Sequence, residues 1–184
     1  PLVKAGYMPR TQRELFDDLA SAFRVMTTGR PGPTFLSLPM DVQAESAEVP
    51  EAIAASENLP RELDDEALAN VNAAADLLAA AARPVIVAGG GVTLANAENE
   101  LVKLAERTGA AVVTTLQGKG CFPEDHPLYG WHLGTKGTSV GNALTTSADV
   151  ILAVGTRFTD QVASSFRAGI TFNFGDTDKV KLIQ

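Results

Sequence analysis

Hydrophobic positions in the first part of the chain follow a helical period and then a strand-like one. Residues 11–28 predict a helix with one apolar face, and Thr11 and Glu14 form a capping box at its start. A segment rich in glycine and proline ends this helix, and Thr34–Leu38 then has the composition of a short strand that must join a sheet. The apolar face of the helix consists of Leu15, Leu19, Phe23 and Met26.

From residue 64 onward, helical and strand-like patterns alternate. This alternation predicts an α/β fold, a Rossmann-like parallel sheet with helices on both faces. The long segment 116–137 is rich in glycine and proline and is interpreted as a loop. The predicted helices run through Leu68, Val71, Ala75 and Leu78, over 95–107, over 140–146 and through Val162 and Phe166; the predicted strands are 85–88, 110–115, 150–154 and the run from Val180, with a weak strand-like stretch at 170–174.

Acidic residues and prolines dominate the segment between these two patterned regions. Such a composition is typical of an interdomain linker. We therefore divide the chain into residues 1–45, a linker at 46–63, and a second domain at 64–184. Because the chain starts without methionine and stops within an apolar run, we expect it to be a fragment of a longer protein.

The overall charge narrows the range of partners. The chain has 184 residues and a formal net charge of -7, which disfavours nucleic acid and anionic membranes because both need a basic surface. Its single cysteine, Cys121, excludes an internal disulfide, and the N-terminus lacks the pattern of a signal peptide. We expect a globular protein of the cytoplasm that binds small molecules or proteins.

Two glycine-bearing turns follow predicted strands and are candidates for binding phosphate. In parallel sheets, ligands lie at the carboxyl ends of strands, and exposed N–H groups at a helix start attract anions. An arginine at such a strand end can bind a phosphate or carboxylate with two hydrogen bonds. The alternatives are a tight turn that only reverses the chain and a surface ion pair with Asp160. The residues concerned are Gly89, Gly90, Gly91, Gly155, Thr156 and Arg157.

The other motifs do not indicate a binding or catalytic site. Residues 134–139 lack the spacing of a P-loop, and Thr138 or Ser139 is expected to cap a helix there. His126 and His132 have no partners at a metal-ligand spacing, and Cys121 has no activating neighbour beyond a lysine. We interpret these three as ordinary loop or packing residues.

Several separated motifs agree in order with one family. They are GRPGPTFLSLPMDV at 29–42, PVIVAGGGV from Pro84, the segment 114–138, and ADVILAVGTRFTDQV from Ala148. With these motifs the chain resembles thiamine-diphosphate-dependent enzymes of the acetolactate synthase type over essentially its whole length. Residues 1–45 resemble the end of the pyrimidine-binding domain, and residues 64–184 resemble the central domain.

The resemblance implies a carboligase or lyase that acts on 2-oxo acids when full length. Thiamine diphosphate and Mg²⁺ would be held by the N- and C-terminal domains, which are absent from this chain, so we expect the fragment alone to be inactive. Gly175–Thr177 is not the metal-diphosphate motif, because the asparagine that follows in that motif is missing. The implied partners are those two domains, a small-molecule nucleotide, and further copies in a homodimer or homotetramer.

In this family the central domain binds FAD, binds ADP, or stays empty. Thr159 and Gln161 replace residues of the family pattern G-x-R-F-D-D-R-V, and Leu133–Gly137 replaces L-G-M-H-G. The same region also resembles trihydroxycyclohexanedione hydrolases, and a stand-alone nucleotide- or flavin-binding module of sirtuin-like fold is a further alternative. The implied cofactor-binding residues are Gly89, Gly90, Gly91, Thr115, Leu116, Leu133, Gly134, Thr135, Lys136, Gly155, Thr156 and Arg157.

Overall fold

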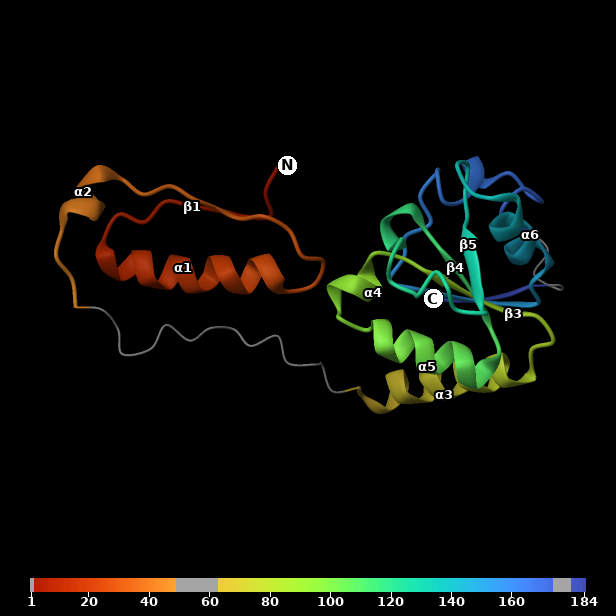
Figure 1. The fold of residues 1–184 in the computed structure, drawn as a ribbon. Coiled ribbons are helices and arrows are strands. Elements are labelled where there is room, and N and C mark those ends of the chain that lie inside the picture. Colours follow the sequence, from red (N-terminus) through yellow and green to blue (C-terminus); the bar gives the residue numbers. More distant parts are fainter. Residues whose placement is uncertain (1, 49–62, 174–179) are drawn as a thin grey trace. The chain divides into compact units, whose positions relative to one another are not determined.

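The chain divides into two compact units, Pro1–Glu62 and Leu63–Gln184 (Figure 1). The computed structural model describes residues 2–48, 63–173 and 180–184. Most of the predicted linker at 46–63 therefore lies outside the described residues, as does the segment 174–179.

The first unit is built on the predicted helix, which is confirmed as α1 (Gln12–Thr27). The Thr11 hydroxyl accepts the N–H of Glu14 over 3.2 Å, as a capping box requires. The Glu14 carboxylate, however, accepts the N–H of Arg10 over 2.8 Å, one residue before the expected donor. Both bonds satisfy N–H groups that would otherwise lack a partner at the start of the helix.

Short parallel strands accompany α1. β1 (Gly6–Tyr7) pairs with β2 (Phe35–Leu36), so the predicted strand at 34–38 is shortened to two residues. Pro39 begins a short helix, α2 (Met40–Ala44), which the sequence pattern did not predict. Phe23, on the predicted apolar face of α1, is 53% exposed because the small sheet provides no second layer to cover it.

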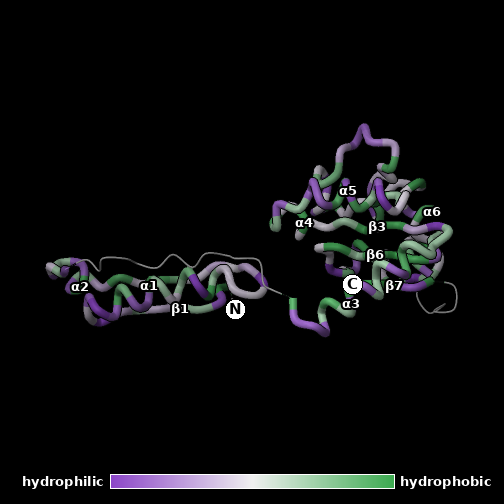
Figure 2. Tube along the Cα trace, turned by 90° about the horizontal axis from the view of Figure 1, so that it is seen from below, coloured by the Kyte–Doolittle hydropathy of each residue, from purple (hydrophilic) through white to green (hydrophobic). Residues whose placement is uncertain are grey.

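The second unit is a parallel α/β sheet, which confirms the predicted fold class (Figures 1 and 2). Within its described residues the strand order is β5-β4-β3-β6-β7, and every pair is parallel. The strands are β3 (Pro84–Ala88), β4 (Ala111–Thr114), β5 (Tyr129–His132), β6 (Val150–Val154) and β7 (Lys181–Ile183). The helices are α3 (Asp65–Ala80), α4 (Gly91–Leu94), α5 (Glu98–Thr108) and α6 (Ser139–Ser147), with single 3₁₀ turns η1 (Leu116–Gly118) and η2 (Ser164–Phe166).

Side chains on the central strands alternate between two hydrophobic cores. Ile86 on β3 joins the core under α4 and α5, whereas Val85 and Val87 join the core on the opposite face. This alternation follows from the two-residue period of a strand, and it leaves both faces of the sheet apolar. Figure 2 shows β3 and β6 as predominantly hydrophobic for this reason.

Three predicted helices need correction. The helix predicted at 95–107 is α5, which begins only at Glu98 because Asn96 adopts a positive φ of 51°; the short helix α4 before it was not predicted. The helix through Val162 and Phe166 is only the 3₁₀ turn η2, where the backbone again has positive φ. Of the predicted apolar face of α3, only Leu78 is buried.

The segment predicted as a loop at 116–137 contains a strand. β5 pairs with β4 at Val112↔Tyr129 and at Thr114↔His132. The second pair lies three residues further along β5 but only two further along β4, so β5 contains a bulge. Trp131 has φ 65° at this bulge. The expected strand-like stretch at 170–174 is reduced, within the described residues, to a single bridge between Ala168 and Phe172.

Candidate functional site

Two glycine turns meet at the carboxyl ends of β3 and β6. The N–H of Gly89 donates to the carbonyl of Val154, and the N–H of Gly91 donates to the carbonyl of Gly155, both over 2.9 Å. The two turns are therefore joined by backbone hydrogen bonds rather than standing apart as separate loops.

Steric contact explains why these positions are glycine. A Cβ on Gly89 would lie 2.4 Å from the Gly155 carbonyl oxygen, and one on Gly155 would lie 2.6 Å from the backbone N of Val92. Gly155 also has a φ of 58°, which side chains disfavour. Since Gly89 and Gly91 use their N–H groups internally, only the N–H of Gly90 in this turn makes no hydrogen bond within the described part of the chain.

A third turn follows β4 at the same edge of the sheet. The N–H of Thr115 donates to the Ala88 carbonyl over 2.9 Å, and the Thr115 hydroxyl accepts the N–H of Gly118 over 3.1 Å. Thr115 is buried, whereas Leu116 is 62% exposed. Of these two predicted site residues, therefore, Thr115 fixes the turn, whereas the apolar side chain of Leu116 lies at the surface of the described residues.

Residues 133–137 form a rigid loop beyond β5. The side chain of Asn142 on α6 accepts the N–H of Gly134 over 2.9 Å and donates to its carbonyl over 3.1 Å. The N–H of Thr135 donates to the carbonyl of Gln161 over 2.8 Å. Gly134 has φ 106°, and a Cβ there would lie 2.4 Å from the same Gln161 oxygen. The loop is thus held from two sides, by α6 and by the segment after β6.

Asn142 is a residue that sequence reasoning missed. Asparagine is unfavourable in helix interiors because its side chain competes for backbone hydrogen bonds. An asparagine within the helix predicted at 140–146 was therefore the sequence signal that could have revealed this role. The α6 start agrees with the expected cap, since the Thr138 hydroxyl accepts the N–H of Gly141 over 3.0 Å.

Arg157 is exposed at the end of β6. Among the residues that the structure describes, it makes no ion pair with Asp160, so the surface-pair alternative lacks support there. Lys136 is also exposed. The carboxyl edge of the sheet therefore carries two cationic side chains and the open N–H of Gly90, which together suit an anionic ligand.

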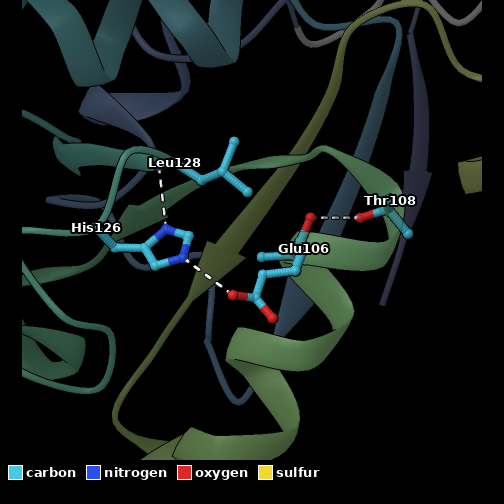
Figure 3. A network of polar contacts seen from close by, with 5 residues as sticks. Glu106, Thr108, His126 and Leu128 are labelled. Atoms are coloured by element: carbon cyan, nitrogen blue, oxygen red, sulfur yellow. Dashed lines mark hydrogen bonds and ion pairs between the residues drawn. The ribbon is translucent and has the colours of Figure 1, made fainter.

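His126 ties the 116–128 segment to α5 (Figure 3). Its Nδ1 accepts the N–H of Leu128 over 3.1 Å, and its Nε2 lies 3.5 Å from the Glu106 carboxylate. Phe122 packs edge-on against the same ring. These contacts give His126 a packing role, in agreement with the interpretation from the sequence.

The remaining candidate groups do not form a reactive centre. Burial raises the pKa of the Cys121 thiol above its ordinary value, which disfavours the thiolate. Over residues 2–48, 63–173 and 180–184, no cluster of three metal-ligating side chains occurs. A search of the same ranges finds no helix whose length and hydrophobicity would allow it to cross a membrane.

Comparison with known families agrees with this architecture. Residues 71–183 match the model described as "Thiamine pyrophosphate enzyme, central domain". This chain therefore belongs to the thiamine pyrophosphate enzyme family through its central domain, which confirms the resemblance expected from the sequence.

Individual relatives point to the same family. The chain is 40% identical to the probable acetolactate synthase large subunit of Methanocaldococcus jannaschii, over 91% of this chain and 29% of the relative. It is 38% identical to the glyoxylate carboligase of Escherichia coli O157:H7, over 80% of this chain and 25% of the relative. The chain thus spans less than a third of the length of these relatives.

A solved structure has the same fold. It is described as a thiamin diphosphate-dependent enzyme from Mycobacterium smegmatis and superimposes with a TM-score of 0.66 at 29% identity. The match covers 85% of this chain and 30% of that one. The assignment of cofactor-binding residues to the carboxyl edge is tested by none of these matches and stays a prediction.

Proposed function

We propose that this chain is the central region of a thiamine-diphosphate-dependent carboligase or lyase that acts on 2-oxo acids, in the manner of acetolactate synthase. The support is the family match over 71–183 together with relatives named as acetolactate synthase and glyoxylate carboligase. The chemistry of the whole protein requires its other domains, and the chain alone is inactive.

Within that protein, the central domain binds FAD or ADP at the carboxyl edge of its sheet. The observation that carries this proposal is the exposed Arg157 at the end of β6, which has no ion-pair partner within the described residues. A guanidinium is well suited to a diphosphate because it can donate two parallel hydrogen bonds.

The residues at this edge fit the diphosphate of such a nucleotide. Arg157 and Lys136 supply positive charge, Gly90 supplies a backbone N–H, and Thr156 supplies a hydroxyl. Their roles are to bind and orient the phosphates, while the ring-side loop at 133–136, held by Asn142, limits where the rest of the ligand lies. A bound FAD would supply a flavin ring without net redox work in the carboligation.

Mg²⁺, and with it the metal-bound diphosphate of thiamine diphosphate, does not fit the described residues of this chain, because no cluster of three or more metal-ligating side chains occurs there. We assign both groups to the other domains of the full-length protein, which functions in the cytoplasm as a homodimer or homotetramer.

A structural role for the central domain is the second candidate. It is favoured by the internal hydrogen bonds of Gly89 and Gly91, which leave only one open N–H in that turn. In this case the domain binds no nucleotide and only packs against its neighbours. The trihydroxycyclohexanedione hydrolases and a stand-alone nucleotide- or flavin-binding module are further alternatives from the sequence.

Release of a bound nucleotide tests the proposal. The purified chain is denatured, the precipitate is removed, and the supernatant is analysed by absorbance and mass. Released FAD supports the acetolactate-synthase type, and released ADP supports an ADP-binding branch. If neither is released, even after the folded chain is incubated with both nucleotides, the structural role replaces the proposed one.

A further inference from the structure

A polar cleft lies beside α6, on the side of the 133–137 loop. Its volume is about 270 Å³, and it is lined by Gly134, Thr135, Asn142, Ser164, Ser165, Arg167 and Ile170. Neither Arg157 nor the turn at Gly89–Gly91 contributes to it. The cleft shares Gly134 and Thr135 with the cofactor-binding residues proposed above, so the two sites adjoin at the 133–137 loop.

The charge of the cleft lining is positive. Arg167 is the only charged residue in it, and within the described residues its guanidinium has no hydrogen bond or ion pair. All other lining residues are polar or glycine, with the exception of Ile170. A cleft with one free guanidinium and no carboxylate favours an anion over a cation or a neutral apolar ligand.

A buried hydroxyl adds a donor to this lining. Ser164 is 5% exposed, and its Oγ lies 2.5 Å from the hydroxyl of Thr171, which is fully buried. The pair has two protons and one shared hydrogen bond, so one proton must be directed elsewhere. Since only Ser164 of the two lines the cleft, its O–H is the natural donor to a ligand there, and Thr171 donates to Ser164.

The floor of the cleft is fixed by the same contacts that fix the loop. Asn142 uses its oxygen and one N–H on Gly134, which leaves its second amide N–H for a ligand. The hydroxyl of Thr135 donates to the Gln161 carbonyl over 3.3 Å and could donate to an anion only by giving up that long bond. The Asn142 side chain is thus held in place before any ligand enters, which lowers the entropic cost of binding.

From this arrangement we propose that the cleft binds a small oxyanion, a phosphate or a carboxylate. Arg167 donates to the anion with its guanidinium, Ser164 with its O–H and Asn142 with its second amide N–H. The volume suffices for inorganic phosphate or a short carboxylic acid and is below that of most drug-sized ligand sites. This site goes beyond the proposed nucleotide function and does not depend on it.

Titration of the 184-residue chain with inorganic phosphate and, separately, with acetate tests this inference. Amide chemical shifts of Thr135, Ser165 and Arg167 are followed by NMR at constant ionic strength, so that general screening does not contribute. Saturable shifts with phosphate alone assign the site to phosphate groups, and saturable shifts with acetate assign it to carboxylates. If neither anion gives saturable shifts, the inference is wrong.

Variants locate the binding. Arg167→Gln is expected to weaken binding by about tenfold or more, because it removes a charge-assisted hydrogen bond, and Arg167→Lys to weaken it less. Arg107→Gln is the matched control, an exposed arginine in the last turn of α5 and outside the cleft, and should leave phosphate or acetate binding unchanged. If Arg157→Gln abolishes binding while Arg167→Gln does not, the anion site is the nucleotide edge and the inference is overturned.

Discussion

The backbone N–H of Gly91 donates to the carbonyl of Gly155 over 2.9 Å, and this bond joins two turns that lie 64 residues apart in the sequence. Glycine is therefore required at these positions for close backbone packing, whether or not a ligand binds. A Cβ on Gly91 would lie 2.6 Å from Cα of Gly155. The carboxyl edge of the sheet is therefore rigid even without a bound nucleotide.

Gly89→Ala is expected to destabilise the chain by about 3 kcal/mol, since its Cβ would meet backbone atoms that cannot yield. Gly109→Ala is the control, because Gly109 also needs special backbone freedom, with φ 64°, but a Cβ there meets nothing within 4 Å. Its cost should be only about 1 kcal/mol. Urea unfolding measures both, and equal losses would contradict the packing argument.

The sequence predicted the sheet well where the pattern was local. β3 and β6 are short apolar runs that are each followed by glycine, and their alternation with helices determines a parallel sheet. Thr138, one of the two residues expected to cap a helix at this point, is confirmed as the cap, because capping depends on residues within one turn.

The features that the sequence did not predict depend on contacts between residues that are separated along the chain. β5 contains Gly130 and an exposed Trp131 at a bulge, so its pattern lacks the strict alternation of a strand, and only pairing with β4 creates it. The hydrogen bonds that occupy Gly89 and Gly91 come from the end of β6, and no motif in the turn itself reveals them. The two hydrogen bonds between the Asn142 side chain and the backbone of Gly134 likewise join residues eight positions apart.

Thr114→Val is expected to stabilise the chain by about 1 kcal/mol. The Thr114 hydroxyl is fully buried and has no hydrogen-bond partner within the described residues, so the isosteric replacement removes an unsatisfied group. Thr145→Val is the matched control, because the Thr145 hydroxyl is equally buried but donates to the carbonyl of Thr171. That variant should lose about 1 to 2 kcal/mol. Thermal unfolding compares the two, and a loss of stability in Thr114→Val would contradict the prediction.

Asp149 links the starts of β3 and β6. Its carboxylate accepts the N–H groups of Ala82 and Arg83 over 2.7 and 2.9 Å. Burial by itself would raise the pKa of Asp149, but these and neighbouring N–H groups outweigh it and lower the pKa below its ordinary value of 3.8. Because the folded-state pKa is the lower one, this contribution to stability is present above the unfolded-state pKa and is lost as the pH falls through the folded-state pKa.

Asp149→Asn should therefore cost about 1 to 2 kcal/mol at pH 7, where the parent carboxylate is ionised. The difference between variant and parent should shrink below about pH 4. Asp125→Asn is the control, since Asp125 is exposed and its side chain makes no hydrogen bond within the described residues. Urea unfolding at several pH values measures this, and a difference that is independent of pH would argue against the role of the charge.

Cys121 is expected to react slowly with iodoacetamide in the folded chain. It is 1% exposed, and burial raises the pKa of its thiol above the ordinary value of 9.0. At pH 8 the reaction should be roughly 100-fold or more slower than in the urea-unfolded chain, because it requires local opening. Asp125→Cys in a Cys121→Ala background supplies an exposed thiol for comparison. Equal rates for the two thiols would show that Cys121 is accessible.

Arg157→Ala is expected to weaken FAD or ADP binding by about tenfold or more, because the guanidinium is the strongest donor at the carboxyl edge. Since Arg157 is exposed, the same variant should unfold at the same urea concentration as the parent. Arg107→Ala controls for the general loss of a positive charge, because Arg107 lies in the last turn of α5, away from the carboxyl ends of the strands. Isothermal titration with each nucleotide measures the affinities. Binding that is unchanged in Arg157→Ala, or lost equally in Arg107→Ala, would remove Arg157 from the site and leave the structural role as the better account of this domain.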